Sequence, residues 1–400
     1  MNPLLQRLHP DPFERWRELT SDLQPPPGLG PINLGIGEPK HATPRLVLDA
    51  LKEGFPALSA YPPTMGEPRL REACARWLQR RYGVHVDPLA QVLPVNGSRE
   101  ALFAFAQVVI DPTRPGATVV CPNPFYQIYE GAALLAGART AFANPDPELA
   151  KVGNFAPDWS SIDDATWARA QLLYVCSPGN PTGAVMPLSE WERLFELSDR
   201  HGFVIASDEC YSEIWFGDQP PLGGLEAAAR LGRHDFRRLL AFTSLSKRSN
   251  VPGLRSGFVA GDAALIEPFR LYRTYHGSAM GGMVQAASAA AWSDEDHVLA
   301  NRELYRVKFE QVTPRLQRVL DVRLPDAGFY LWAAVPADDV QWARGLLAQY
   351  NVTVLPGSLL ARQSNGHNPG AGRVRMALVA GIDECLEAAD RIVSYVRNTP

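Results

Sequence analysis

The chain has 400 residues, of which 46% are hydrophobic and 20% are charged, and its formal net charge is -4. This is the composition of a globular protein with a large core, and it argues against nucleic acid or an anionic membrane as a partner. The five cysteines are scattered without C-x-x-C spacing, so we expect no metal and a reducing, cytoplasmic location. The sequence shows neither a signal-peptide core nor an apolar run of about 18 residues that could span a membrane.

The first 45 residues are rich in proline and in loop-forming residues, as in "DLQPPPGLGP" (22–31) and "INLGIGEPKHATP" (32–44). We expect residues 1–45 to form an arm that packs on a smaller C-terminal domain. Further along, "PRLREACARWLQRRYG" (68–83) has the spacing of an amphipathic helix. We interpret its five arginines as the solvated face of this helix.

Short apolar runs recur through the middle of the chain, and runs of this kind are typical of strands that are covered on both faces. They span residues 91–95, 117–121, 139–143, 172–176, 203–207, 239–243 and 257–261. Helical segments separate many of them, and the segment at 188–202 carries a capping-box pattern at Ser189 and Glu192 and a stop at Gly202. This alternation predicts a three-layer α/β/α large domain over residues 46–290, with a mainly parallel seven-stranded sheet.

The pattern changes after about residue 290. A long helix is expected near 295–320, and two more near 337–350 and 383–397. Strand-like runs lie between them at 328–335, 352–357 and 372–379. Residues 291–400 are therefore predicted to form a smaller α/β domain.

Polar clusters follow five of the predicted strands. They read "NGSRE" (96–100), "PNPFY" (122–126), "SPGNPTG" (177–183), "SDECY" (207–211) and "SLSKR" (244–248). Any one of them would pass for an ordinary turn. Because ligands of a parallel sheet bind at the carboxyl ends of its strands, five such clusters at one edge predict a binding site.

Two of these clusters carry a pair suited to one kind of chemistry. Lys247 follows a buried strand, where an amine tends to have a depressed pKa and can attack a carbonyl. Asp208 follows the preceding strand; alone it would be interpreted as a cap or turn residue. Together, an amine and an acid that could protonate a ring nitrogen match what pyridoxal phosphate requires.

A phosphate site is also predicted. The backbone N–H groups of Gly97, Ser98 and Arg99 would open a helix, where the dipole favours an anion. Hydroxyls and a guanidinium from a second segment could add donors, namely Ser244, Ser246 and Arg255. An ordinary helix N-cap would explain Gly97 and Ser98 equally well.

Three further residues could contact a planar ring. Tyr126 could stack on it, although core packing also explains this tyrosine. Asn180 and Tyr211 could hydrogen-bond a ring hydroxyl, although the tight turn "NPTG" accounts for Asn180 by itself.

At this point the chain resembles the class I and II aminotransferases of pyridoxal-phosphate fold type I, over nearly its whole length. The matching segments occur in the family's order: "NLGIGEP", "YPPTMGEPRLREA", "NGSREAL", "NPFYQIY", "SPGNPTG", "SDECY", "SLSKRSNVPGLRSGF" and "GRVRMAL". The resemblance implies a fold type I enzyme with pyridoxal 5'-phosphate (PLP) as cofactor and with amino acids and keto acids as substrates.

The resemblance assigns roles to individual residues. Lys247 matches the lysine that holds the cofactor and shuttles the proton, and Asp208 matches the partner of the pyridine nitrogen. Asn180 and Tyr211 match the pair that bonds the ring hydroxyl, and Tyr126 matches the stacking aromatic. Gly97, Ser98, Ser244 and Arg255 match the phosphate cup, and Arg99 is assigned to it through its backbone N–H alone.

The resemblance also implies contacts beyond the cofactor ring. Tyr61 matches a tyrosine that reaches the phosphate of the neighbouring subunit, which implies a homodimer with shared active sites. Arg375 matches the arginine that clamps the substrate α-carboxylate, and Arg373, two residues away on the same face of a strand, stays open as an alternative. Gly37 fits a loop that closes over this carboxylate.

Two segments point to a substrate. "MNPLLQRLHPDPFERWREL" (1–19) and "LYRTYHGSAMGGMVQAAS" (271–288) resemble the bacterial N-succinyl-L,L-diaminopimelate aminotransferases of lysine biosynthesis. That resemblance implies amino transfer between glutamate and N-succinyl-2-amino-6-oxopimelate. Candidates for reading the long dicarboxylate are Arg17, Arg273, Tyr275, His276 and Ser278, each of which has an ordinary surface or packing interpretation as well.

Alternative functions remain open from the sequence. One is a related aminotransferase for aspartate, aromatic amino acids or acetylornithine, or a β-lyase of the same fold. Another is a PLP-binding regulator, which is disfavoured because the segment before the large domain is short, proline-rich and not basic. A dehydrogenase is disfavoured because no GxGxxG follows an early strand.

Overall fold

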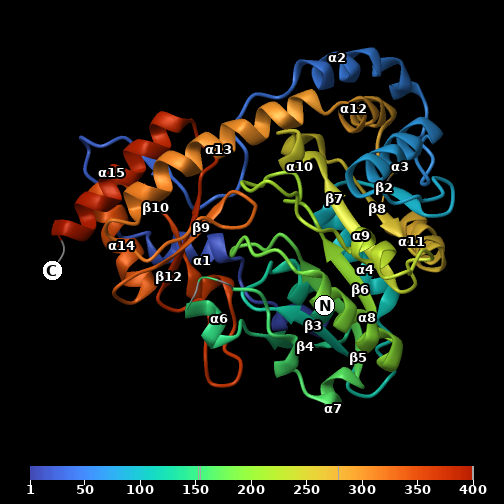
Figure 1. Cartoon of the computed structure of the whole chain (residues 1–400), viewed down its shortest axis with the longest axis horizontal. Coiled ribbons are helices and arrows are strands. Elements are labelled where there is room, and N and C mark those ends of the chain that lie inside the picture. The colour runs from blue at the N-terminus through green and yellow to red at the C-terminus, as the bar shows by residue number, and fades with distance from the viewer. Residues whose placement is uncertain (152, 154, 278, 399–400) are drawn as a thin grey trace.

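The computed structural model describes residues 1–151, 153, 155–277 and 279–398. Its centre is a seven-stranded sheet with the strand order β2-β8-β7-β6-β5-β3-β4 (Figure 1). In chain order the strands are β2 (Val92–Val95), β3 (Thr118–Pro122), β4 (Arg139–Ala143), β5 (Ala170–Cys176), β6 (Val204–Asp208), β7 (Leu239–Ser244) and β8 (Gly257–Gly261). Each overlaps one of the seven apolar runs, so the predicted sheet is confirmed.

One strand of this sheet runs against the rest. β8 is antiparallel to both of its neighbours, β7 and β2, whereas the other neighbouring strands pair in parallel. Because β8 is reversed, the residues that precede it lie at the edge where the other strands end. This reversal brings Arg255, which lies just before β8, to the same edge as Lys247, which lies just after β7.

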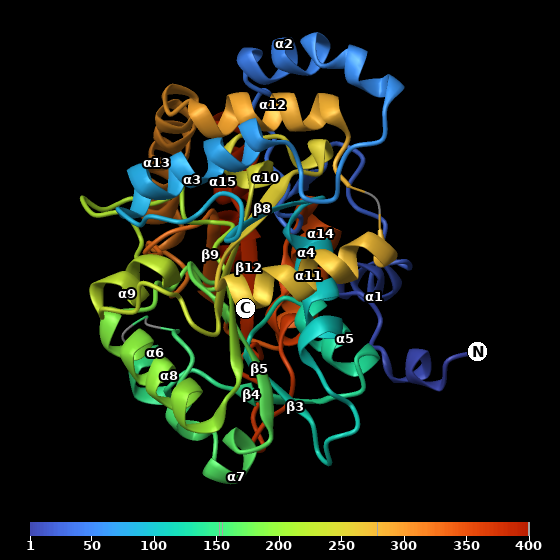
Figure 2. The ribbon, with the colours of Figure 1, turned by 90° about the vertical axis from the view of Figure 1, so that its right-hand side faces the viewer.

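Helices cover both faces of the sheet (Figure 2). On one face lie α4 (Ser98–Val109), α5 (Ile128–Leu135) and α11 (Ala263–His276), and on the other lie α8 (Leu188–His201) and α9 (Gly224–Arg230). Along β5, Leu172 and Tyr174 belong to the core under α4, while Leu173 and Val175 pack with Trp191 of α8. Successive side chains point to opposite faces, so a strand buried on both sides is apolar throughout.

A helical layer at the far end of the large part corrects one prediction. α2 (Arg45–Glu53), α3 (Pro68–Tyr82) and α12 (Gly282–Ser293) pack together there (Figures 1 and 2). The arginines of α3 are only partly a solvated face. Arg71 is buried and donates to the Pro88 carbonyl, and Arg81 is bound to Glu213.

The predicted cap of α8 is half right. The helix begins at Leu188 after Pro187, which makes no side-chain cap, so Ser189 lies inside the first turn and the capping box is wrong. Proline serves at this position because the N–H that it lacks has no partner inside a helix. The stop is confirmed, since Gly202 has φ 84° and ends the helix in the left-handed conformation.

A smaller α/β part lies beside the large one (Figure 1). Its antiparallel sheet has the order β11 (Leu355–Pro356), β12 (Arg373–Ala377), β9 (Tyr330–Ala334), and a two-stranded parallel sheet joins β1 (Ile32–Asn33) to β10 (Val352–Thr353). Its helices are α1 (Pro12–Leu19), α13 (Asp296–Leu316), α14 (Asp339–Tyr350) and α15 (Ile382–Asn398).

The N-terminal residues share the core of this smaller part. Trp16, Ile32 and Leu34 pack there with Val352 and Leu355. The two-residue strand β1 lies in the segment 32–44, which the sequence indicated to be loop-rich. The division of the chain at residues 45 and 290 remains a prediction, which this packing supports.

The remaining elements are short. They are the helices α6 (Pro147–Lys151), α7 (Asp164–Trp167) and α10 (Leu245–Arg248) and the 3₁₀ turns at Pro3–Arg7, Phe55–Ser59, Trp159–Ser161, Pro252–Leu254 and Gly357–Leu360. In the described ranges, no helix combines the length and the apolar character needed to cross a bilayer.

Candidate active site

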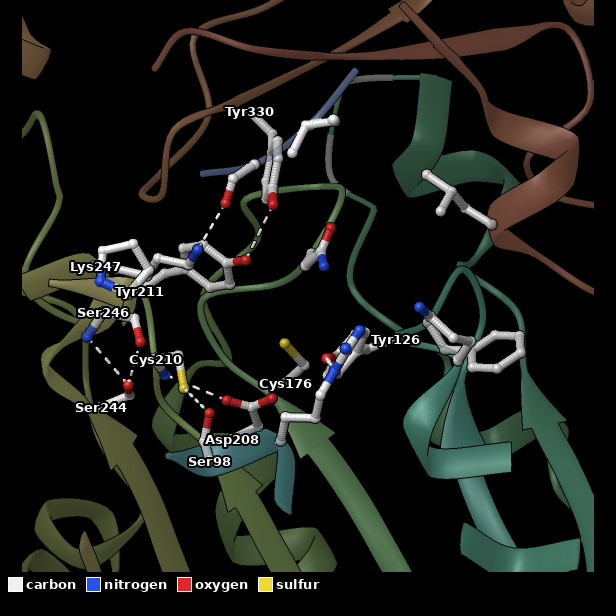
Figure 3. A pocket seen from close by; sticks show the side chains of 18 of the residues that line it. Ser98, Tyr126, Cys176, Asp208, Cys210, Tyr211, Ser244, Ser246, Lys247 and Tyr330 are labelled. Atoms are coloured by element: carbon white, nitrogen blue, oxygen red, sulfur yellow. Dashed lines mark hydrogen bonds between the residues drawn. The ribbon is translucent and has the colours of Figure 1, made fainter. Parts of the chain in front are cut away.

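A cavity of about 370 Å³ opens where the strands of the large sheet end, and β9 and β12 of the smaller part close its other side. Figure 3 shows Lys247 and Tyr126 on opposite walls, Asp208 at the base and Tyr330 at the top. Most of the residues singled out from the sequence meet here. Those that line the cavity are Gly37, Ser98, Arg99, Tyr126, Asn180, Asp208, Tyr211, Ser244, Ser246, Lys247, Arg255 and Arg375.

Lys247 projects its amine into this cavity from the short helix α10, directly after β7. Its Nζ donates to the Gly37 carbonyl over 2.6 Å. Burial lowers the pKa of Lys247 to about 8, because desolvation disfavours the charged ammonium. Part of the population is therefore the neutral, nucleophilic amine near neutral pH.

Asp208 lies at the base of the cavity, at the end of β6, and is only 5% exposed. Tyr129 on α5 donates its hydroxyl to Oδ2 over 2.7 Å, and the backbone N–H of Cys210 donates to Oδ1 over 3.3 Å. Burial raises the pKa of Asp208, while these donors oppose that shift. The two hydrogen bonds aim the carboxylate at the cavity floor.

The side of the cavity where a phosphate site is predicted lies at the beginning of α4. Gly97 precedes this helix with φ 89°, a conformation that L side chains rarely adopt, and a Cβ at this position would lie 2.4 Å from Nη2 of Arg255. The arginine donates to the Pro252 and Asn96 carbonyls, which hold it over the helix N-terminus. A guanidinium beside a helix N-terminus favours a bound anion.

The serines on the neighbouring wall form a local network (Figure 3). Ser244 caps α10 by accepting the N–H of Ser246 over 3.1 Å, and the two hydroxyl oxygens are 2.9 Å apart. Ser98, at the start of α4, accepts a hydrogen bond from the Cys210 thiol over 3.0 Å. These hydroxyls line the cavity and could turn toward an anion bound there.

Arg375 comes to the cavity from β12 and is 3% exposed. It donates through Nη1 to the Asn180 side chain over 3.1 Å and through Nη2 to the Gly35 carbonyl over 2.6 Å. Its Nε is buried and has no hydrogen-bond partner among the described residues. The geometry therefore favours Arg375 over Arg373, whose guanidinium lies 4.4 Å from the centre of the Phe155 ring and which does not appear among the residues that line the cavity.

Aromatic hydroxyls complete the walls. The hydroxyl groups of Tyr211 and Tyr330 lie 3.1 Å apart, and burial raises the pKa of Tyr211 well above its ordinary value. On the other wall, Arg99 donates through Nε to the Tyr126 hydroxyl over 2.6 Å, and burial raises the pKa of Tyr126 to about 12. Both tyrosines thus stay neutral and can act as hydrogen-bond donors.

Several predicted residues lie elsewhere. Tyr61 is fully exposed in this chain, so its predicted contact depends on a second subunit. Arg273 is buried and paired with Glu100, His276 stacks on Tyr272 and lies 3.5 Å from the same carboxylate, and Tyr275 is 86% exposed. Arg17 is exposed on α1, and none of these residues lines the cavity. Ser278 lies outside the described residues.

The sequence did not single out four residues that matter for this cavity. Tyr129 holds Asp208, and Tyr330 contacts Tyr211. Phe13 and Gln127 line the mouth and are tied together, because Asp11 accepts hydrogen bonds from the Phe13 N–H and from the Gln127 side chain. Apart from the bond between Asp11 and Phe13, these contacts join segments that are far apart in the chain, so local sequence patterns carried no signal for them.

The family model for aminotransferases of class I and II matches residues 30–392. The chain belongs to this family. Its members depend on PLP, and this aminotransferase has the fold type I architecture of its structural neighbours.

Three known proteins illustrate the similarity. An aminotransferase from Neisseria meningitidis Z2491 is 55% identical, with a TM-score of 0.94 over 98% of this chain and 99% of its own. The LL-diaminopimelate aminotransferase of Nitratidesulfovibrio vulgaris (strain DSM 19637 / Miyazaki F) is 32% identical over 376 residues, 92% of either chain. A probable N-succinyldiaminopimelate aminotransferase from Thermus thermophilus is 27% identical, with a TM-score of 0.84 over 96% of this chain and 100% of its own.

The residues present fit the family's cofactor. Lys247 offers a partly neutral amine for its aldehyde, and Asp208 offers a carboxylate for its ring nitrogen. A Cβ at Gly97 would fill the space beside Arg255, where the helix N-terminus and the guanidinium could bind one anion. Arg375, which lines the cavity, offers a guanidinium for a substrate carboxylate. The aminotransferase thus has a matching polar group for the aldehyde, the ring nitrogen and the phosphate of the cofactor and for the carboxylate of an amino acid.

Proposed function

We propose that this aminotransferase moves an amino group between glutamate or 2-oxoglutarate and N-succinyl-2-amino-6-oxopimelate or N-succinyl-L,L-diaminopimelate. The charge of the cavity carries the proposal. The charged residues in its described lining are four cations, Arg99, Lys247, Arg255 and Arg375, and one carboxylate, Asp208, which is buried at the base. A substrate with several carboxylates suits such a cavity.

The position of Arg99 supports the succinylated one of two diaminopimelate substrates. Lys247 and Arg255 would hold the cofactor, and Arg375 would hold the α-carboxylate. This leaves the Arg99 guanidinium, which lies beside Tyr126, without an assigned anion. Free diaminopimelate carries a distal ammonium that needs a carboxylate partner. Both compounds carry a distal carboxylate that could pair with Arg99. The succinylated substrate replaces the ammonium by an amide and adds a further carboxylate, so it needs no acidic partner and offers Arg99 a second anion.

The proposed roles of the residues follow from their positions. When bound, PLP is an electron sink that stabilises negative charge at the substrate Cα. Lys247 holds the cofactor and moves the proton at the substrate Cα, which its pKa of about 8 permits. Asp208, oriented by Tyr129, keeps the ring nitrogen protonated. Asn180 and Tyr211 bind the ring hydroxyl.

The remaining contacts orient the ligands. Tyr126 would stack on the ring, and Arg255 and the helix that begins at Ser98 would hold the phosphate, with Ser244 and Ser246 as further donors. Arg375 and Asn180 would clamp the α-carboxylate, and the loop that contains Gly37 would close over it. A Cβ at Gly37 would lie 2.0 Å from the Tyr330 hydroxyl, so this position requires glycine.

A homodimer with shared active sites is part of the proposal. Phe55, Leu58 and Tyr61 are exposed on one short turn and its flank, with exposed fractions of 51%, 68% and 101%. A second subunit that covers them would bring Tyr61 to the neighbouring cavity. We retain the cytoplasm as the predicted location, since all five cysteines are free.

Half-reactions test the substrate. The holoenzyme is mixed with glutamate, N-succinyl-L,L-diaminopimelate, L,L-diaminopimelate, aspartate, phenylalanine or acetylornithine, and the change in cofactor absorbance is followed. We expect rapid reaction with glutamate and the succinylated compound. The relatives named LL-diaminopimelate aminotransferase make the free diamine the second candidate, and its faster conversion would replace our assignment.

The cofactor lysine has a separate test. Borohydride reduction of the holoenzyme followed by peptide mapping should label Lys247. An unlabelled Lys247 would remove the basis of every role assigned above.

A further inference from the structure

A buried polar cluster lies outside the cavity, behind Lys247. His41, in the loop between β1 and α2, sits between two residues of α13, Asn301 and Lys308. Its Nδ1 is 2.8 Å from Oδ1 of Asn301, and its Nε2 is 2.6 Å from Nζ of Lys308. Asn301 and Lys308 are only 4% and 3% exposed. Burying several polar side chains costs free energy because they lose their contacts with water. None of the three belongs to the residues assigned to the substrate or the cofactor, so the cluster needs another explanation.

The partners determine which tautomer His41 adopts. Oδ1 of Asn301 accepts from Asn250 Nδ2 over 3.0 Å, so the same oxygen must accept from His41 as well. Nδ1 therefore carries the proton. This leaves Nε2 as an acceptor, which matches the Lys308 amine, a group that can only donate when charged. His41 is thus neutral, with a defined donor side and a defined acceptor side.

The donor side leads to Lys247. With Oδ1 occupied by its two donors, Nδ2 of Asn301 donates to the Lys247 backbone carbonyl over 3.3 Å. The same strap of chain, residues 37–41, also contacts the lysine side chain, because the Gly37 carbonyl accepts from Nζ. One end of the strap therefore contacts the reactive amine, and the other end is linked through Asn301 to the peptide that carries this amine.

The acceptor side leads to the smaller part of the enzyme. Lys308 also donates to the Leu378 carbonyl over 3.2 Å, and the neighbouring N–H of Lys40 donates to the Val379 carbonyl over 3.4 Å. Burial lowers the pKa of Lys308 to about 8. The Lys308 amine thus contacts His41 of the strap and donates to the segment after β12, which is the strand that carries Arg375.

We propose that His41, Asn301 and Lys308 form a positioning relay that holds the 37–41 strap and the Lys247 peptide in one fixed arrangement relative to the strand of Arg375. None of the three lines the cavity, and Asn301 reaches its lining only through the backbone carbonyl of Lys247. They act through Lys247, so the inference rests on the proposed role of that lysine. When the contacts of the relay are weakened, the Lys247 amine is held less firmly in position toward the substrate Cα. Proton transfer then becomes slower, while binding of the substrate carboxylate is unchanged.

Two substitutions separate the two sides of His41. His41→Asn keeps an amide nitrogen near the place of Nδ1, and therefore the contact with Asn301, but loses the acceptor for Lys308. His41→Gln keeps an acceptor near the place of Nε2 and loses the donor to Asn301. His234→Gln, at an exposed histidine, is the matched control.

The variants are compared as PLP-loaded enzymes in the glutamate half-reaction and by hydrogen–deuterium exchange with mass spectrometry. For His41→Gln we expect the maximal rate to fall about three- to tenfold, which is the effect expected from the loss of one hydrogen bond. The glutamate concentration at half-maximal rate should change by less than about twofold. Amide exchange should rise in peptides covering 34–45 and also 244–251. His41→Asn should lose less rate and keep 244–251 protected.

Two results would overturn the relay. One is equal rates for His41→Gln and His234→Gln. The other is faster exchange confined to 34–45, which is the signature of a purely local role. Should His41→Gln not fold, Asn301→Ser removes the contact with Lys247 from the other side and must loosen 244–251 in the same way. Exchange is measured without substrate, so failure of the relay is distinct from failure of the borohydride labelling of Lys247.

Discussion

Replacing Tyr129 by phenylalanine tests the chemistry at the base of the cavity. The hydroxyl of Tyr129 donates to Asp208 over 2.7 Å, and its ring stacks on that of Tyr174 with centroids 4.5 Å apart. Tyr129→Phe keeps the ring and removes only the donor. Asp208 then retains the longer bond from the Cys210 N–H in a site where burial already raises its pKa.

The magnitude follows from the bond that is lost. A hydrogen bond to a charged group contributes about 1.5–3 kcal/mol, and a shift of one pKa unit corresponds to about 1.36 kcal/mol. The donor stabilises the ionised form, so its removal should raise the pKa of Asp208 by roughly one to two units. Because the enzyme needs Asp208 ionised, the acidic limb of the kcat/KM profile should move to higher pH by a similar amount.

Tyr174→Phe is the matched control for this assay. Tyr174 is also fully buried, but it donates to the Leu102 carbonyl and does not contact Asp208 by hydrogen bond. The pH profile of kcat/KM is measured for both variants with glutamate as donor. If the acidic limb lies at the same pH in the two variants, Tyr129 does not tune Asp208 and the reasoning fails.

Three further predictions concern the other walls. Arg375→Lys loses the guanidinium fork and should raise the KM for glutamate about ten- to a hundredfold in steady-state assays, whereas Arg373→Lys should change it less than about threefold; equal effects would reopen the choice of clamp. Gly97→Ala places a methyl group against Arg255 and should weaken PLP affinity more than about tenfold by fluorescence titration, and unchanged affinity would argue against a phosphate site here. Lys247→Met should stabilise the apoprotein by roughly 2 kcal/mol below about pH 8, since the folded state disfavours the ammonium. The unfolded chain binds more protons between about pH 8 and 10.5, so this advantage should shrink across that window in denaturant titrations, and a pH-independent difference would contradict it.

The seven strands of the large sheet could be predicted because burial on both faces leaves a local pattern. Runs such as 172–176 are apolar throughout, and the polar clusters that follow them mark the edge where ligands bind. Lys247 and Asp208 follow neighbouring strands, so their meeting at one edge is a consequence of strand order in a parallel sheet. Helix stops at glycines, such as Gly202, were equally local.

Short-range patterns misled where packing decides. Ser189 and Glu192 have the spacing of a capping box, but the helix starts earlier, at Leu188. Arg273 looked available to a substrate, but it is buried against Glu100. The sequence does not reveal which residue a charged side chain pairs with, and Glu100 lies 173 residues away from Arg273 along the chain.

By itself, then, the amino-acid order determined the α/β class, the edge that carries the site and the chemical identity of the groups placed there. The tertiary structure alone decided which side chains hold those groups in place: Tyr129 against Asp208, Arg375 rather than Arg373 in the cavity, and His41 between α13 and Lys247. The physical reason is range. Burial and capping act on neighbouring residues and leave a periodic trace, whereas hydrogen bonds between distant segments depend on how helices and sheets pack, and packing leaves no local trace.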